Sequence, residues 1–145
     1  MKIMILALLA AMAGWAWGGS ADALLRGETS SGRTKLELRV GDLDGLIREV
    51  KLTVDGEEIT WKNADHSPQT VIRDVENGVY VLSVTQGEKS FRLWMVPGSE
   101  KVVKKGPNEF ESRFAAIIEA SDPRAKTPLK WTPRITIGCH LKWKI

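Results

Sequence analysis

Short segments in which apolar and polar residues alternate recur along this chain, and they constrain its fold more than any other feature. Residues 36–40 carry leucine or valine at every second position, and residues 50–54 repeat the pattern. A period of two is typical of strands that bury one face. Asp55-Gly56 follows the second segment, and this pair tolerates the positive φ angles of a tight hairpin turn. The pattern therefore predicts antiparallel strands joined by short turns.

Further strands are expected at 70–75, 79–85, 90–96 and 135–145. Residues 109–121 fit helical spacing as well as strand spacing, and the number of neighbouring strands favours a strand that pairs with the last one. Residues 24–34 are expected to form a flexible arm, and Ser99–Asn108 mostly a loop. We predict an all-β fold: an antiparallel β-sandwich, immunoglobulin-like or transthyretin-like, of about seven or eight strands over residues 35–145.

The first residues have the pattern of a secretory signal peptide. Lys2 precedes an unbroken apolar run, Ile3–Ala13, and small residues follow in Ala16-x-Gly18 and Ala21-x-Ala23. The run is shorter than the roughly 20 apolar residues of a membrane-spanning helix. We therefore predict a cleaved signal peptide at 1–23, a secreted or periplasmic location, and no membrane span after processing.

The rest of the chain has the composition of one globular domain. The whole sequence is 43% hydrophobic and 27% charged, which is not the composition of a disordered chain. Its single cysteine, Cys139, excludes an internal disulfide. Val54-Asp55-Gly56, followed by 77–84, loosely resembles transthyretin-like and PEGA-type envelope modules. Many hairpin proteins share these patterns, and we assign no family from them.

Candidate catalytic and metal-binding residues are few, which disfavours an enzyme. The sequence has no Gly-x-Ser-x-Gly motif, and Cys139 and His140 are neighbours in an expected strand, so they should point to opposite faces. Asp65-His66-Ser67 fits a polar loop better than a triad assembled from separate segments. Asp42 and Asp44 supply two carboxylates but not the rest of a calcium loop, and we interpret them as turn residues. No metal or cofactor is expected.

A binding surface is the remaining hypothesis. The chain is net acidic from Leu24 to Glu88 and net basic from Lys89 to its end, and Trp131 lies in a proline-bounded segment between cations. An exposed tryptophan could stack on a sugar or anchor a protein, but the high average burial of tryptophan favours a Trp131 that closes one end of the sandwich. The candidate binding residues are Lys101, Lys104, Lys105, Lys130, Trp131 and Arg134.

These observations predict an exported, non-catalytic binding or accessory domain of the cell envelope. Its expected partner is an envelope protein or an anionic glycan. Nucleic acid is not expected, because the chain is predicted to be exported. The alternative is a small secreted enzyme or enzyme inhibitor whose site lies on end loops, with Ser99–Asn108 as the candidate inhibitory loop and His66 as the candidate catalytic residue.

Overall fold

The computed structural model describes residues 22–41, 44–126 and 134–144. Within these ranges the chain folds into antiparallel strands and two short 3-10 helices, so the prediction of an all-β fold is confirmed. The elements are β1 (Ala23–Glu28), β2 (Thr34–Val40), β3 (Ile47–Val54), β4 (Glu57–Trp61), η1 (Ala64–His66), β5 (Gln69–Asp74), η2 (Val75–Asn77), β6 (Val79–Gln86), β7 (Lys89–Met95), β8 (Lys101–Gly106), β9 (Glu109–Ser121) and β10 (Arg134–Lys144).

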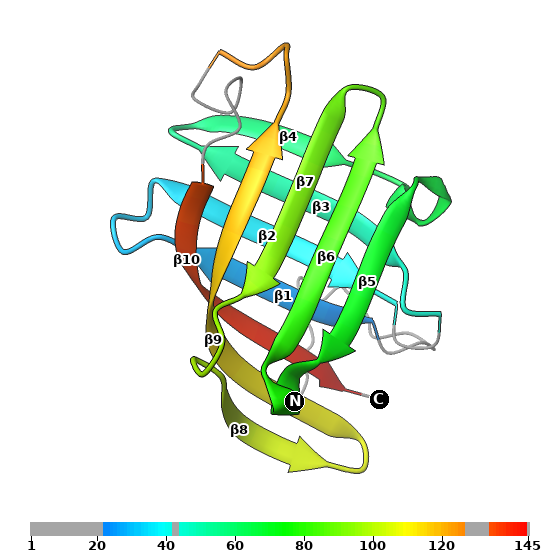
Figure 1. Cartoon of the computed structure of the whole chain (residues 1–145), viewed down its shortest axis with the longest axis vertical. Coiled ribbons are helices and arrows are strands. Elements are labelled where there is room, and N and C mark those ends of the chain that lie inside the picture. Colours follow the sequence, from blue (N-terminus) through cyan, green and yellow to red (C-terminus); the bar gives the residue numbers. More distant parts are fainter. Residues whose placement is uncertain (1–21, 42–43, 127–133, 145) are drawn as a thin grey trace, which may run out of the picture.

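The strands form one ten-stranded sheet that curls into a half-barrel (Figure 1). Their order is β4-β3-β2-β1-β10-β9-β7-β6-β5, and β8 pairs with β9 beside this path. Figure 1 shows β1–β4 crossing steeply behind β5–β7. The long strands β9 and β10 connect the two groups. An immunoglobulin-like or transthyretin-like sandwich is not confirmed, because a single curled sheet contains all ten strands.

The expected hairpin between β3 and β4 is present. Asp55 and Gly56 have φ angles of 50° and 87°, which lie in the left-handed region that suits a two-residue hairpin turn. Val54 then pairs with Glu57, and the register continues to Val50 opposite Trp61.

The core lies between the crossing groups of strands, on the inner face of the curled sheet. Strand β2 shows how the alternation builds it, because every second residue from Thr34 to Val40 is buried. Trp61 is fully buried and its ring packs at 5.6 Å from that of Phe91. Tyr80 and Phe114 form a second aromatic contact, at 5.7 Å. Inner-face residues of β2, β4, β6, β7 and β9 therefore meet in one continuous core.

The expectation of a flexible arm at 24–34 is wrong for its first part, because Ala23–Glu28 forms β1. This strand lies between β2 and β10 and pairs with both. Its inner face carries Ala23, Leu25 and Gly27, and the two small residues hide the apolar alternation that marks the other strands. Residues 23–28 are a strand because they pair with β2 and β10, and this pairing cannot be predicted from the sequence alone.

The expectation of a loop at 99–108 is also wrong in part, because Lys101–Gly106 forms β8, a strand that pairs with the first part of β9. All but the last of its residues are exposed, so it shows no alternation. The strand interpretation of 109–121 is confirmed by β9. Ser112 does not interrupt β9, since its buried hydroxyl donates a hydrogen bond to the carbonyl of Lys101 at 3.2 Å.

The expected signal peptide at 1–23 lies outside the described residues, except for Asp22 and Ala23. Across the described part of the chain, no helix has the length and apolar character needed to cross a membrane.

Candidate functional site

A row of mostly basic side chains crosses the outer face of the sheet, and we call it the basic row. Residues that are directly opposite one another in an antiparallel pair point to the same face. Six neighbouring strands each contribute one residue, and at about 4.8 Å between strands the row is about 24 Å long. The basic row consists of Lys101 on β8, Arg113 on β9, His140 on β10, Arg26 on β1, Glu37 on β2 and Lys51 on β3.

The basic row lines a broad open groove of about 1210 Å³. The groove is hollowed where Ala115 and Gly138 stand opposite each other on β9 and β10. A Cβ atom added at Gly138 would meet only the Glu28 carbonyl oxygen, at 3.9 Å, so nothing fills the space above this glycine. Hydroxyl groups of the β1–β2 turn, including Ser30 and Ser31, also line the groove. The groove thus combines charges with neutral hydrogen-bonding groups.

Basic residues outnumber acidic ones along the groove, where five Lys or Arg side chains accompany two Glu. Arg26 and Glu37 form an exposed ion pair at 3.3 Å. Among the described residues, no carboxylate lies within ion-pair distance of the other four cations. These four, which we call the open cations, are Lys35, Lys51, Lys101 and Arg113.

His140 lies at the centre of the basic row, between Arg113 and Arg26. Its Nε2 atom is 2.6 Å from Oε2 of Glu111. The hydrogen bond to His140 holds the pKa of the Glu111 carboxyl below its ordinary value. Glu111 therefore stays charged and orients the imidazole at this point of the row.

The cations that were predicted as one patch do not all line the groove. Only Lys101 lines the groove among those described. The ammonium of Lys104 is 3.5 Å from Glu109, and that of Lys105 is 2.7 Å from Glu76. Arg134 pairs with Glu119 at 2.8 Å and stacks over Trp94, with 5.8 Å to the ring centroid. Lys130 and Trp131 lie outside the described residues.

Sequence reasoning missed most of the basic row because its members come from both halves of the chain. Arg26 and Lys51 belong to the net acidic half, where no cationic cluster is visible in sequence. The alternation does predict that each of them faces solvent. Only the pairing of β1 with β10 brings this half beside His140 and Arg113.

The candidate catalytic residues do not form a nucleophile and base. Cys139 is buried, and burial raises the pKa of its thiol to about 12, while His140 points to the opposite face. The His66 side chain is 87% exposed and lies 4.0 Å from the Asp65 carboxylate. His66 lines neither the groove of the basic row nor the hollow around Tyr80 and Trp143.

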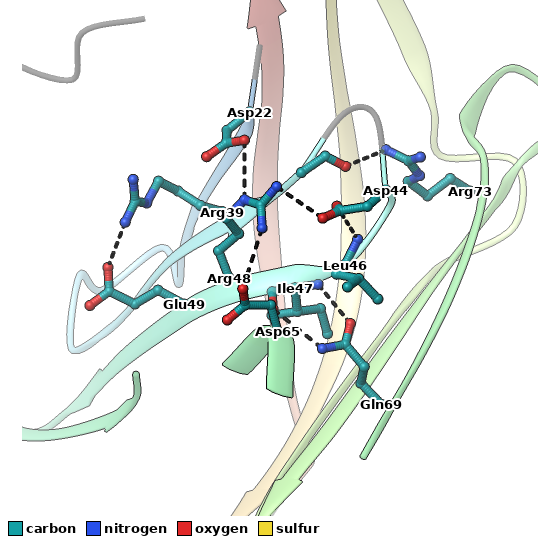
Figure 2. A network of polar contacts seen from close by, with 11 residues as sticks. Asp22, Arg39, Asp44, Leu46, Ile47, Arg48, Glu49, Asp65, Gln69 and Arg73 are labelled. Atoms are coloured by element: carbon teal, nitrogen blue, oxygen red, sulfur yellow. Dashed lines mark hydrogen bonds and ion pairs between the residues drawn. The ribbon is translucent and has the colours of Figure 1, made fainter. Parts of the chain in front are cut away.

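Asp44 and Asp65 belong to a network around Arg48 (Figure 2). The Arg48 guanidinium lies 3.4 Å from Asp22, 3.1 Å from Asp44 and 3.5 Å from Asp65. The Leu46 N–H donates to Asp44 at 3.0 Å, and this bond, together with the charge of Arg48, holds the pKa of Asp44 below its ordinary value. Asp44 thus closes the β2–β3 turn, and Asp42 lies outside the described residues.

Gln69 adds a second connection in the same region. Its amide oxygen accepts a hydrogen bond from the Ile47 N–H at 2.7 Å, and its amide nitrogen donates to the Ala64 carbonyl at 2.7 Å. Gln69 begins β5 and Ile47 begins β3, so the side chain joins the two groups of strands where they do not pair with each other (Figure 2). These residues are structural supports for the curled sheet.

Within the described ranges, no group of three or more His, Cys, Asp or Glu residues is placed to hold a metal ion. Comparisons of the chain with protein-family models, with curated proteins and with solved structures gave no match.

Proposed function

We propose that this chain is an exported, non-catalytic binding domain of the cell envelope and that its basic row binds an anionic glycan. The observation that carries the proposal is the set of open cations along one groove. A cation that is not held in an ion pair by a carboxylate leaves an attractive electrostatic potential for an anion. Four such cations in an open groove suit a chain of repeated negative charges better than one small anion.

The groove also has the shape and chemistry for a polysaccharide. The basic row extends for about 24 Å, which matches several sugar units rather than one. Serine and threonine hydroxyls of the β1–β2 turn can exchange hydrogen bonds with sugar hydroxyls. The predicted export makes envelope glycans available and makes nucleic acid a poor candidate.

The position of β1 supports processing at the earlier of the two candidate cleavage points. Cleavage after Gly18 would keep β1 whole. Cleavage after Ala23 would remove Asp22, which pairs with Arg48, and Ala23, which is buried opposite Val40. Sequencing the amino terminus of the protein recovered from its own cells tests this point, and a start at Leu24 would contradict it.

An enzyme inhibitor is the alternative, with the β8–β9 hairpin as its contact surface. Figure 1 shows this hairpin at one end of the molecule, beyond the crossing strands. Val102 and Val103 on it are 39% and 50% exposed, and exposed apolar side chains are common where proteins meet. Inhibition of an exported hydrolase that is lost on Val103→Asp would favour this alternative.

Binding to immobilised polysaccharides tests the glycan proposal. We expect the protein to bind a sulfated polysaccharide and polygalacturonate but not neutral dextran, with an affinity that falls as salt is added. Lys51→Glu combined with Arg113→Glu should weaken this binding about tenfold or more, because it reverses two open cations. Binding to dextran with equal affinity would overturn the proposal.

Two further double variants change the net charge of the protein by the same amount as Lys51→Glu with Arg113→Glu. Lys62→Glu with Arg124→Glu alters exposed cations that do not line the groove and should leave binding nearly unchanged. Lys104→Glu with Lys105→Glu tests the patch predicted from sequence. A loss confined to this last variant would place the site at Lys104 and Lys105 and exclude the basic row, whereas equal losses in all three would show only an effect of overall charge.

A further inference from the structure

A second hollow of about 390 Å³ lies at the end of the half-barrel where β1 begins and β10 ends. Phe110 and Trp143 form part of its wall as directly paired residues of β9 and β10. Both are half-buried and pack against the core. Leu141, Ala23 and Val75 extend the apolar wall. Small-molecule sites commonly have volumes of about 300–1000 Å³, mostly apolar walls and a position at the mouth of a β-barrel.

The wall also contains a polar group without a partner. Tyr80 lines this hollow and is buried, and its hydroxyl makes no hydrogen bond with any described residue. A buried hydroxyl without a partner costs stability, so a ligand oxygen that accepts a hydrogen bond from it would recover part of that cost. Burial raises the pKa of Tyr80 far above its ordinary value, which keeps the hydroxyl protonated as a donor.

The charges at the rim balance each other. The lining includes two cations, Arg73 and Lys105, and two carboxylates, Asp74 and Glu76, and Lys105 and Glu76 form an ion pair at 2.7 Å. The rim therefore offers little net attraction to either sign of charge. This differs from the basic row, which is lined by an excess of cations.

We propose that this hollow binds a small uncharged amphipathic molecule, with its apolar body against Phe110, Leu141 and Trp143 and an oxygen that accepts a hydrogen bond from Tyr80. The Tyr80 hydroxyl is covered in the unliganded protein, so binding includes a small shift of side chains in the wall. The site is independent of the proposed glycan surface, and either proposal can fail without the other.

Fluorescence of the uncharged probe N-phenyl-1-naphthylamine tests the site. We expect the purified protein to enhance the probe's emission and 1-octanol to displace it at lower concentration than octanoate, because the rim has no excess cation to hold a carboxylate. No enhancement would overturn the site. Stronger displacement by octanoate would overturn the assignment of an uncharged ligand.

Two tryptophan variants locate the binding. Trp143→Ala should weaken probe binding about tenfold, because it removes part of the wall. Trp94→Ala is the matched control, since Trp94 is also half-buried but lies on the outer face beneath Arg134. Far-ultraviolet circular dichroism shows whether each variant is folded. Equal losses in the two folded variants would place the probe elsewhere.

Tyr80→Phe tests the hydrogen bond without relying on a large truncation. It removes only the unpartnered hydroxyl, so Tm in the absence of ligand should be unchanged or higher. The affinity for 1-octanol should fall about fivefold, which is the worth of one ordinary hydrogen bond. An unchanged octanol affinity would exclude the Tyr80 hydroxyl as a ligand contact.

Discussion

Two neighbouring residues, Cys139 and His140, show how strongly the strand period separates chemical environments. The Cys139 side chain enters the core, and the next side chain joins a charged row on the outer face. The buried thiol cannot be a nucleophile, because burial disfavours its thiolate. It is instead a small apolar component of the core.

We expect Cys139 to be unreactive in the folded protein. With a pKa of about 12, the thiol should not react with a chromogenic disulfide reagent at about pH 8, and it should react fully after unfolding in guanidinium. Cys139→Ser should lower the free energy of unfolding by about 1–3 kcal/mol, because it puts a hydroxyl into an apolar layer. Rapid labelling of the folded protein would contradict the buried position.

Two glycines in strands lead to a second prediction, because a side chain would clash with its neighbours at one of them and would fit at the other. A Cβ atom added at Gly27 would lie 2.8 Å from Cδ1 of Ile137 and 3.1 Å from Sγ of Cys139. Gly27→Ala should therefore destabilise by about 1–3 kcal/mol through overpacking. Gly138→Ala is the control, since Gly138 faces the open groove, and it should be neutral or slightly stabilising. Urea unfolding measures both, and equal costs would show that the close packing at Gly27 is wrong.

At the scale of elements, β1 is the strand on which the basic row and the curled sheet both depend. It supplies Arg26 to the row and fills the space between β2 and β10. Leu25, which is fully buried, lies between Leu38 and Leu141 on the inner face. If residues 23–28 formed a loose arm, neither β2 nor β10 would have a paired strand along the edge that β1 occupies.

Alanine substitutions at adjacent positions distinguish a central strand from an arm. Leu25→Ala should lower the free energy of unfolding by about 2–5 kcal/mol, because it leaves a cavity in the core. Leu24→Ala, on the partly exposed outer face, should cost much less. Chemical denaturation measures both values. Small and equal effects would show that residues 23–28 do not form part of the sheet.

At the scale of the whole molecule, side-chain contacts support a half-barrel whose end strands, β4 and β5, do not pair with each other. The Arg48 network ties the start of β1, the β2–β3 turn and η1 together, and Gln69 ties β5 to the start of β3 (Figure 2). Burial alone would lower the pKa of Arg48, but the charges of Asp44 and Asp22 outweigh it and raise that pKa. The guanidinium therefore stays charged at this junction.

The carboxylate of Asp44 should contribute to stability in a pH-dependent way. Because its pKa is lower in the folded chain than its ordinary value, its contribution is complete above about pH 4 and is lost as the pH falls through the folded value. Asp44→Asn keeps an acceptor for Leu46 but removes the charge. Since the side chain is 41% exposed, solvent screening should limit the loss of unfolding free energy in Asp44→Asn, relative to the unaltered protein, to about 0.2–1 kcal/mol at pH 7.

Urea unfolding at about pH 7 and about pH 3 measures this difference, which should be smaller at the lower pH. Glu88→Gln is the control, because Glu88 is exposed and has no ion pair among the described residues. It should have no effect at either pH. If the difference in unfolding free energy between Asp44→Asn and the unaltered protein grew on acidification, the sign of the pKa shift of Asp44 would be contradicted.

The local structure follows from patterns that are visible in the sequence. Alternation in 36–40, 50–54 and 135–145 predicted strands and the face of each side chain, and Asp55-Gly56 predicted the hairpin turn. The alternation therefore also predicted that Cys139 and His140 point to opposite faces of the sheet. These conclusions hold because the strand period and the turn preference depend only on residues that are close in the chain.

The order of the strands in the sheet, in contrast, is known only from the three-dimensional fold. The small inner residues of β1 and the exposed side chains of β8 give no apolar alternation, so pairing with β10 and β9 had to define both strands. The same pairing joins Arg26 and Lys51 to His140 and Arg113, while Lys104 and Lys105 are held in ion pairs and are not members of that row. Strand order depends on how distant inner faces fit together in one core, and no local pattern encodes that fit.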